Sequence, residues 1–559
     1  MQIVGFARFG YAGEIVKIEA DLRRGIPAVD IVGLPDGAVR EARERMRAAI
    51  RNSGLEYPRE RILLNLSPAD LKKEGSSFDL PIALAVLGAS KGTEQKADQG
   101  FDTARTQNDR TSFGATQFGR TSFGADTVMA LGELELSGAV RPVRGVLAAV
   151  SRGLAEGIVR FIVPADNQIE ARSCPGAEVA GVRTLTEALH AYRNPSCAAF
   201  ATGASSLPDG AEAYRSEGGT YEAVWSPDVR VAGDYADVRG QSALVRALQI
   251  AAAGGHNLIA YGPPGCGKTL ALSRFPALLP DLDPDTAVTV TRIHSLVGLS
   301  QAECCTSRIH RPPFREPHQN ASLEGIIGGG THGSPGEISL AHGGALFLDE
   351  AAQFRSSVLQ ALRTPLETGA VSVSRAGRTS TFPARFQLLL AVNPCPCGHY
   401  GSPGRICTCT AESISAYWKR LAAPLLDRIE LRVRVLPGSG DELMRTPGFS
   451  TAGLRADIGK ARRMQWTRNR KAAGTADWLN SHLDGSRLQE VCAMEGSAAR
   501  TFALAADKTD VSSRGAHALL RVARTIADLA GEARVGEDHI LEACSLRKWS
   551  DTVPDFLGA

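Results

Sequence analysis

The sequence lacks long apolar segments, a strong excess of one charge, and the features of an exported protein. No uninterrupted apolar stretch reaches the ~18 residues of a membrane-spanning helix, so we expect no transmembrane segment and no membrane partner. The opening residues, MQIVGFAR, have neither the basic start nor the apolar core of a signal peptide. The 63 basic and 60 acidic residues leave a net charge of only +3, so nucleic-acid binding would have to come from local basic groups.

Cysteines are few, and their number does not suit a disulfide scaffold. There are 11 of them, an odd number, and one lies inside a glycine-rich loop. Free thiols in this pattern predict a reducing, cytoplasmic location. A chain of 559 residues is too long for a single core, so two to four domains are expected.

The most specific motif is a glycine-rich octapeptide between an apolar run at 258–261 and a helical pattern that begins at Leu270. It matches GxxxxGK[ST] at every position: Gly262-Pro263-Pro264-Gly265-Cys266-Gly267-Lys268-Thr269. The glycines let successive backbone N–H groups turn toward phosphate oxygens, and the helix N-terminus adds positive partial charge. We expect Lys268 to reach the β- and γ-phosphates of ATP and Thr269 to bind Mg²⁺ through its hydroxyl.

A second apolar run, at 344–348, ends in two adjacent acids and predicts a buried parallel strand. Ligands of open α/β sheets bind at the carboxyl ends of the strands, which is where Asp349 and Glu350 would lie. We expect Asp349 to hold Mg²⁺ and Glu350 to orient or deprotonate the attacking water. The two acids therefore predict hydrolysis of ATP as well as its binding.

From Asp234 onward the chain resembles the magnesium-chelatase-like branch of the AAA+ ATPases. The segment 234–241 (DYADVRGQ) resembles the stretch that contacts adenine. The strand pattern 386–392 ends at Asn393, which resembles the sensor 1 residue that helps to position the attacking water. The sequence LLDRI places Arg428 where the family has its arginine finger, although Asp427 and Arg428 could also form a plain surface pair.

The same resemblance implies a second arginine and a ring of subunits. Arg514 begins the penultimate helical pattern and resembles sensor 2. Arg521, seven residues on, shares about the same helical face and is the alternative. An arginine finger that acts on a neighbouring subunit's nucleotide implies a ring, and we expect a homo-hexamer.

Two insertions refine the resemblance. The segment 315–330 resembles the helix-2 insert of chelatases and replicative helicases. Alternating residues in 371–383, around Ala376-Gly377, predict a β-hairpin that resembles the pre-sensor-1 hairpin of ring helicases. That hairpin points into a central pore, where Arg375 and Arg378 would grip a DNA backbone without reading its sequence. A hairpin tip that carries arginines only for solubility is the alternative that remains open.

Four cysteines lie close together after the predicted sensor 1 strand, as two CxC pairs separated by nine residues: Cys395, Cys397, Cys407 and Cys409. Four thiolates suit a closed, tetrahedral, structural Zn²⁺ site, with His399 as a substitute ligand. They leave no open coordination position, so a catalytic zinc is not expected. The alternative is a loop of four reduced thiols.

The predicted organisation is a multi-domain α/β chain in four parts. Three segments, 72–81 (KKEGSSFDLP), 132–145 and 162–164, resemble the Lon-protease-like α+β fold, to which we assign residues 1–193. Within that part, 93–127, where RTSFGA occurs twice, predicts a disordered insertion. Residues 194–230 predict a linker and 231–436 the AAA+ P-loop α/β core, which includes the cysteine cluster. The remaining residues, 437–559, predict a C-terminal α-helical lid.

The N-terminal part lacks the residues of a working Lon-type peptidase, which needs a nucleophilic serine and a lysine that activates it. The segment expected to supply the lysine carries Arg144 and has no lysine, and Ser76 and Ser77 have no obvious base. We therefore predict an interaction or DNA-handling module without peptidase activity.

The layout of the whole chain resembles the ComM/YifB family of bacterial competence-associated proteins. That resemblance implies an ATP-driven branch-migration helicase that acts on single-stranded or branched DNA in homologous recombination during natural transformation. Two other activities stay open. A protein remodeller or protease regulator would suit a Lon-like domain fused to a motor. A magnesium-chelatase motor subunit is the other, although the Lon-like domain and the cysteine cluster argue against it.

Overall fold

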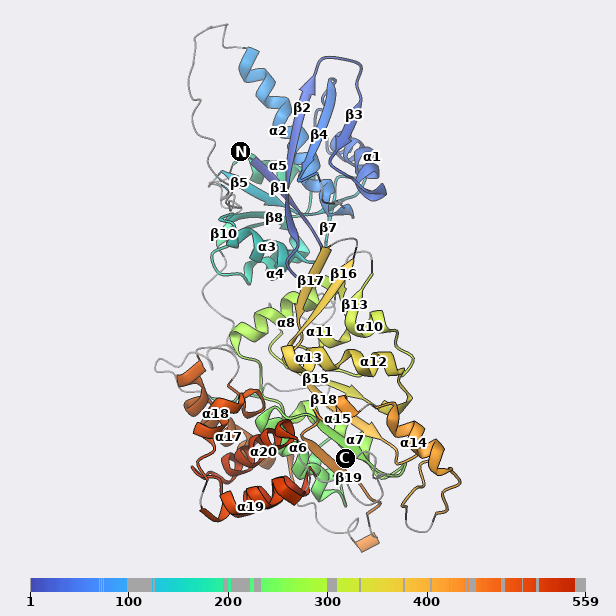
Figure 1. Cartoon of the computed structure of the whole chain (residues 1–559). Helices are drawn as coiled ribbons and strands as arrows, with labels where there is room; N and C mark the ends of the chain where they lie inside the picture. The colour runs from blue at the N-terminus through green and yellow to red at the C-terminus, as the bar shows by residue number, and fades with distance from the viewer. Residues whose placement is uncertain are drawn as a thin grey trace, which may run out of the picture. The chain divides into compact units, whose positions relative to one another are not determined.

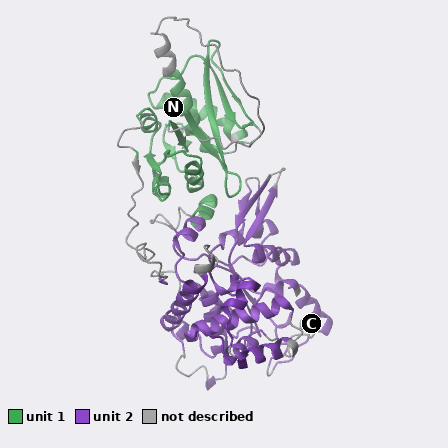
Figure 2. Cartoon of the chain, turned by 60° about the vertical axis from the view of Figure 1, so that its left-hand side comes forward, with its two compact units in different colours: residues 1–206, 291–308 green, residues 207–290, 309–559 purple. Residues whose placement is uncertain are grey.

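The computed structural model describes most of the chain, and Figure 1 labels its elements. The described residues are 2–69, 71, 73, 75–97, 123, 126–194, 200–202, 222–225, 233–298, 309–330, 333–375, 378–402, 405–421, 423–438, 440–441, 449–473, 478–494, 496–508 and 512–547. Contacts divide the chain into two compact units (Figure 2): unit 1 contains 1–206 and 291–308, and unit 2 contains 207–290 and 309–559. No helix among the described residues is both long and apolar enough to cross a membrane.

Unit 1 is built on a mixed sheet of eight strands in the order β10-β9-β8-β5-β1-β2-β4-β3. Antiparallel and parallel pairing meet at β1, which runs antiparallel to β2 and parallel to β5. The strands of this sheet are β1 (Gln2–Ala7), β2 (Glu14–Arg23), β3 (Val29–Val32), β4 (Arg61–Ser67), β5 (Thr127–Ala130), β8 (Arg160–Pro164), β9 (Glu178–Val182) and β10 (Ala201–Thr202). A separate pair is β6 (Glu133–Leu134) with β7 (Val140–Arg141).

The helices of unit 1 cover this sheet with apolar faces. They are α1 (Gly37–Asn52), α2 (Asp79–Ala97), α3 (Val146–Ala155), α4 (Gln168–Arg172) and α5 (Leu185–Arg193), with 3₁₀ helices η1 (Ser76–Phe78) and η2 (Ala165–Asn167). The Asp36 carboxylate starts α1 by accepting a hydrogen bond from the Val39 amide at 2.7 Å. In β4 every second side chain is buried, which gives the sheet one core-facing side.

Two predicted boundaries in this part of the chain differ from the structure. The predicted insertion 93–127 begins inside α2, because that helix continues to Ala97, and it ends at the first residue of β5. Apart from 93–97, 123 and 126–127, the insertion lies outside the described residues. The predicted linker 194–230 contains β10, which adds to the edge of the sheet by pairing Ala201 with Val179.

Unit 2 is built on a parallel sheet of five strands in the order β12-β15-β18-β11-β19. The strands are β11 (Leu258–Tyr261), β12 (Phe314–Arg315), β15 (Ala345–Leu348), β18 (Gln387–Val392) and β19 (Leu431–Arg434). All residues of β11, β15 and β18 are buried, as their continuous apolar sequences predict. Arg315, the first residue of the predicted helix-2 insert, is in the edge strand β12 of this sheet.

Helices and short strands surround that sheet. They are η4 (Tyr235–Asp237), α6 (Ser242–Gly254), α7 (Lys268–Ser273), η5 (Phe275–Leu278), α8 (Pro284–Val297, whose last seven residues belong to unit 1), α10 (Leu323–Ile327), β13 (Gly328–Gly329), β14 (Ser334–Pro335), α11 (Glu337–Leu340), η6 (Ala351–Gln353), α12 (Ser356–Ala361), α13 (Arg363–Thr368), α14 (Ala411–Lys419) and α15 (Ala423–Leu426).

The C-terminal part of unit 2 is helical, as predicted. Its elements are α17 (Thr451–Ala473), η7 (Asn480–His482), α18 (Gly485–Val491), α19 (Gly496–Lys508), α20 (Ser513–Ala530) and α21 (Glu537–Ser545). Helix α6 contacts β11 and β19 as well as α17 and α20, and one hydrophobic cluster includes residues from the sheet and from these helices. The predicted nucleotide core and lid therefore share one apolar core.

The predicted hairpin is confirmed. Strands β16 (Ala370–Arg375) and β17 (Arg378–Pro383) pair antiparallel, and Arg375 stands opposite Arg378. Hydroxyl pairs link the strands, with Ser372 3.1 Å from Thr381 and Ser374 2.8 Å from Thr379. Figures 1 and 2 show the hairpin standing out from the body of unit 2.

Candidate nucleotide-hydrolysis site

The octapeptide 262–269 forms the turn between β11 and α7, at the carboxyl edge of the parallel sheet. Gly265 and Gly267 have φ of +78° and +86°, in the left-handed region that favours glycine. At Gly262 a Cβ atom would lie 1.9 Å from the Val435 carbonyl oxygen, so only glycine fits beside β19. The loop therefore has the backbone freedom that a phosphate cradle needs.

Lys268 is buried at the start of α7 without a carboxylate in hydrogen-bonding contact. Its ammonium donates to the carbonyl oxygens of Gly262 at 2.7 Å and Pro263 at 2.8 Å, and to Asn393 Oδ1 at 3.2 Å. Burial lowers the pKa of Lys268, although Cys266 and then the nearby acids Asp349 and Glu350 oppose that shift. A buried cation whose contacts are mainly neutral oxygens would be stabilised by an anionic ligand. The loop therefore fits a nucleotide phosphate.

The two acids follow β15 and lie beside the loop, as the sequence predicted. Thr269 Oγ1 donates to Asp349 Oδ2 at 3.1 Å, which places a hydroxyl and a carboxylate oxygen where one small cation could bind both. Such oxygen ligands suit Mg²⁺, which binds proteins through one or two oxygens and keeps the rest of its shell for phosphate and water. Thr269 and Asp349 would hold this ion and orient the phosphates.

Glu350 has a backbone that few residues adopt, with φ of +49° and ψ of +46°. Two side-chain amides hold its carboxylate: Gln319 donates at 2.8 Å and Gln353 at 2.5 Å, both to Oε2. A non-glycine residue in the left-handed region costs free energy, and such strain is common at functional sites. This arrangement fixes the position of the predicted base.

Sequence reasoning left three side chains near the two acids unassigned. Gln319 and Glu316 belong to the segment compared with the helix-2 insert, and Gln353 is three residues after Glu350. Burial, reinforced by the charge of Asp349, raises the pKa of Glu316. No sequence motif marks Gln319 or Gln353, because only the fold brings their amides to Glu350.

Asn393 follows β18, the strand between β11 and β15, and the structure brings it to the loop through Lys268. The next residue, Pro394, accepts a hydrogen bond from the Trp418 indole at 3.0 Å, which ties this turn to α14. Lys268, Thr269, Asp349, Glu350 and Asn393 therefore gather at one edge of the sheet. Their catalytic roles stay predictions.

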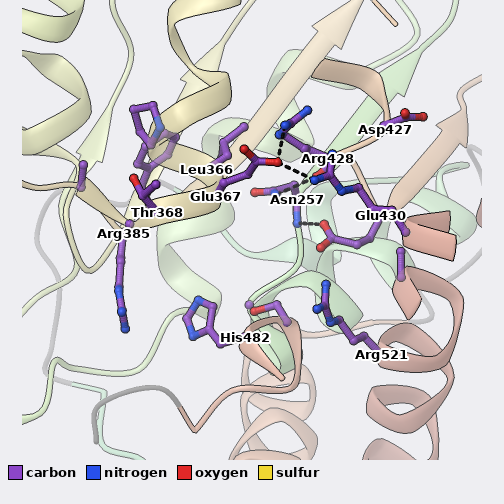
Figure 3. Close-up of a pocket in the computed structure, with 18 residues that line it drawn as sticks. Asn257, Leu366, Glu367, Thr368, Arg385, Asp427, Arg428, Glu430, His482 and Arg521 are labelled. Carbon is purple, nitrogen blue, oxygen red and sulfur yellow. Dashed lines mark hydrogen bonds and ion pairs between the residues drawn. The ribbon is translucent and has the colours of Figure 1, made fainter. Parts of the chain in front are cut away.

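The two candidate arginines meet elsewhere in unit 2, on the wall of a pocket of about 520 Å³ (Figure 3). Arg428 and Arg514 both donate to Oε1 of Glu367, in α13, and the contact from Arg514 measures 2.5 Å. The residues that line this pocket include none from 262–269. Arg428 thus pairs with Glu367, a residue that sequence reasoning missed, and the structure gives no ion pair between Arg428 and Asp427.

Arg521 lines the same pocket but contacts a different partner. Its Nε and Nη2 atoms both donate to the Leu483 carbonyl oxygen, with the Nε contact at 2.9 Å. Burial lowers the pKa of Arg521. Of the two sensor 2 candidates, Arg514 is the one that shares a carboxylate with Arg428.

The four cysteines after Asn393 converge, with all four Sγ atoms within 4.8 Å of one another. The Cys395–Cys397, Cys397–Cys407 and Cys395–Cys407 sulfur pairs are 3.3, 3.6 and 3.7 Å apart. A tetrahedral zinc with Zn–S bonds of about 2.3 Å needs sulfurs about 3.8 Å apart, so this donor set fits the ion. Cys266 is separate, because its thiol donates to the Pro263 carbonyl oxygen.

The cysteine cluster packs against the phosphate loop. Gly398 directly follows Cys397 and has a φ of +80°. A Cβ atom at this position would lie 2.7 Å from Cδ of Pro264 in the phosphate loop. The amide of Tyr400 donates to the Cys395 sulfur at 3.3 Å, and a hydrogen bond from the His399 backbone lowers the pKa of Cys397 to about 6. The four sulfur atoms would hold a zinc ion as a structural clamp on this turn.

Replacing Cys397 and Cys409 together with serine is expected to release about one zinc ion per chain, since two thiolates cannot complete a closed four-coordinate site. Elemental analysis of the purified protein by plasma mass spectrometry measures this. Cys544→Ser, outside the cluster, is the matched control and should keep its metal. Equal zinc content in the double variant and the control, or none in either, would contradict the zinc assignment.

The predicted DNA contacts and the Lon-like site are only partly described. The backbones of Arg375 and Arg378 face each other across the hairpin, and their side chains and the turn at Ala376-Gly377 lie outside the described residues. In unit 1, the hydroxyl of Ser76 donates to Oε2 of Glu133 at 2.6 Å. Arg144, at the position where a lysine was expected, is exposed.

Comparison with known proteins now identifies the family of the chain. The family model described as magnesium chelatase, subunit ChlI, matches residues 234–443, and the model of its C-terminal region matches 448–547. A further model, described as subunit ChlI of Mg-chelatase, matches 18–102. Together these matches cover unit 1 in part and most of unit 2.

Full-length relatives narrow the assignment. The chain is 37% identical to the uncharacterized protein YifB of Escherichia coli over 552 residues, covering 97% of this chain and 96% of the relative. It is 36% identical to the competence protein ComM of Haemophilus influenzae over 544 residues, with the same coverage of 97% and 96%. A magnesium-chelatase 38 kDa subunit of Acidiphilium rubrum is 26% identical, but over only 54% of this chain and 85% of its own length. The chain therefore belongs to the ComM/YifB family of magnesium-chelatase-like proteins.

Proposed function

We propose that this chain is an ATP-hydrolysing ring motor that acts on DNA, and that it works as a branch-migration helicase in homologous recombination during natural transformation. The observation that carries ATP hydrolysis is the contact between Thr269 and Asp349 beside a buried Lys268 and a fixed Glu350. The magnesium-chelatase-like AAA+ family implies the same activity with ATP and Mg²⁺. Asn393 would help to position the attacking water.

A ring is supported by the separation of the two arginines from the phosphate loop of their own chain. Arg428 and Arg514 share a pocket that has no lining residue from 262–269. Because an arginine finger must reach the γ-phosphate, Arg428 would serve the nucleotide of a neighbouring copy, with Arg514 beside it. We therefore propose a closed homo-oligomer, with a hexamer as the expected size.

DNA as the substrate is supported by the relative named competence protein ComM and by the β16–β17 hairpin. Two arginines at opposed positions near a hairpin end would bind phosphates without reading sequence. We propose that unit 1 is a Lon-protease-like domain that handles DNA or a partner without peptidase activity, and that residues 437–559 act as the lid. A reducing cytoplasm suits the free cysteines and this activity.

Protein remodelling is the main alternative, and a magnesium-chelatase motor is a weaker one. The chelatase subunit from Acidiphilium rubrum aligns with 54% of this chain, whereas YifB and ComM align with 97%. That difference favours YifB and ComM over the chelatase subunit as guides to the activity. The choice between DNA and protein as the substrate needs a direct test.

The ATPase rate is expected to rise severalfold when single-stranded or forked DNA is added, because a nucleic-acid motor couples turnover to its substrate. Replacing Arg375 and Arg378 together with alanine should lower the ratio of the rates with and without DNA, and DNA binding by the variant should depend less on salt because two phosphate contacts are lost. Arg534→Ala, an exposed arginine in the lid, is the matched control and should keep the ratio. A rate that no DNA changes would favour the protein remodeller.

A further inference from the structure

One carboxylate holds both candidate arginines in the pocket of Figure 3. Glu367, near the end of α13, accepts from Arg428, which lies between α15 and β19, and from Arg514, at the start of α20. Both contacts are made to the same oxygen, Oε1. Segments that are far apart in the sequence thus converge on a single anionic atom.

Arg428 makes hydrogen bonds through two of its three guanidinium nitrogens. Its side chain is 9% exposed, its Nη1 donates to the Pro424 carbonyl oxygen, and its Nη2 donates to Glu367. Its Nε is buried and has no hydrogen-bond partner. Because a buried unpaired donor is costly, this guanidinium can donate to a further anionic oxygen.

Other charges on the pocket wall are engaged elsewhere or lie on the surface. The backbone N–H of Asn257 donates to Glu430 at 2.9 Å, and Arg521 donates to the Leu483 carbonyl oxygen. The charge of Arg428, followed by that of Arg514, offsets the effect of burial and lowers the pKa of Glu367 below its ordinary value. Glu367 therefore stays ionised at neutral pH as the counter-ion of the two arginines.

We propose that Glu367 is a positioning residue that occupies the place of a phosphate oxygen between Arg428 and Arg514, and that a polyphosphate must displace it to engage them. The ligand class is the terminal phosphate of a nucleoside triphosphate, which offers several oxygens to the donors that one carboxylate now shares. This inference rests on the proposed roles of the two arginines. To these roles it adds a competitor within the chain: the carboxylate of Glu367 neutralises both arginines until a phosphate replaces it.

Inorganic tripolyphosphate tests this competition without requiring ATP hydrolysis. Calorimetry would compare Lys268→Ala with Lys268→Ala/Glu367→Gln in the full chain, because loss of Lys268 disables the phosphate loop. Removing the carboxylate charge is expected to tighten binding about three- to tenfold, in line with the modest strength of partly exposed ion pairs. Adding Arg428→Ala to the second variant should abolish the gain. Asp538→Asn, which removes an exposed acid of α21, is the control for net charge and should show no gain.

The alternative is that Glu367 only supports the local structure. In that case Glu367→Gln would leave tripolyphosphate affinity unchanged or weaken it, and that result would overturn the proposal. Glu367→Asp, which keeps the charge on a shorter side chain, should give intermediate affinity and provides a second variant if the glutamine form folds poorly. In the otherwise intact protein, Glu367→Gln should lower the KM for ATP. A wild-type chain that hydrolyses no ATP would defeat the proposed function, whereas the tripolyphosphate result would still decide the role of Glu367.

Discussion

Arg428→Ala is expected to lower the maximal ATPase rate by about 10³-fold or more, with ATP still bound. The reason is that an arginine finger stabilises the charge that develops on the γ-phosphate, an effect worth about 10³–10⁵ in rate. Arg428 lies in a pocket without residues of the phosphate loop, so its removal should leave the nucleotide-binding residues of the same chain intact. Steady-state kinetics together with nucleotide-binding measurements would separate these two effects.

Mixing two inactive variants tests whether the arginine acts between subunits. Arg428→Ala keeps the phosphate loop and lacks the finger, whereas Lys268→Ala lacks nucleotide binding and keeps the finger. In a mixed ring, a Lys268→Ala subunit can supply Arg428 to the neighbour's nucleotide, so the mixture should regain activity. A mixture of Arg428→Ala with the double variant Lys268→Ala/Arg428→Ala is the control and should stay inactive. Activity of Arg428→Ala alone near the wild-type rate would contradict the finger assignment.

Glu350→Gln is expected to bind ATP and to hydrolyse it about 10²–10⁴-fold more slowly, the usual effect of losing a general base. Glutamine has nearly the same shape, so the left-handed backbone and the neighbouring turn should persist. One of the two amide contacts, from Gln319 or Gln353, can be kept through the new carbonyl oxygen. Single-turnover kinetics with saturating protein would measure the chemical step directly.

The neighbouring acid Glu316 gives the matched comparison for that variant. Its raised pKa and its electrostatic coupling to Asp349 make it the other carboxyl that could take a proton here. If Glu350 is the base, Glu316→Gln should retain most of the turnover. The opposite result, with Glu316→Gln inactive and Glu350→Gln active, would move the base to Glu316.

The regular parts of the fold were predictable because local pattern and burial agree in them. The apolar runs before Gly262 and Asp349 became the buried parallel strands β11 and β15, and the alternating residues of 371–383 became a hairpin. In each case an apolar run or an alternation of side chains in the sequence already indicated the element.

The contacts that complete the candidate sites were not predictable from local pattern. Glu367 lies 61 residues from Arg428 and 147 from Arg514, and no motif connects them. The packing of Gly398 against Pro264 joins the cysteine cluster to the phosphate loop across a similar gap in sequence. Such pairings depend on how strands β11, β15, β18 and β19 are ordered in the sheet, which the periodicity of a single strand does not encode.

Unit 1 is built from two separate stretches of the chain, and this limits how the gene could be divided into independently folding parts. The unit takes residues 291–308 from a distant stretch of the chain, and Ser295 there is almost completely buried. Its carbonyl accepts from the Gly145 amide at 3.2 Å, and its hydroxyl donates to Glu170. An N-terminal cassette that ended at residue 206 would leave these groups without their partners. A recombination event that moved unit 1 into another protein would therefore have to transfer residues 291–308 as well as the N-terminal stretch.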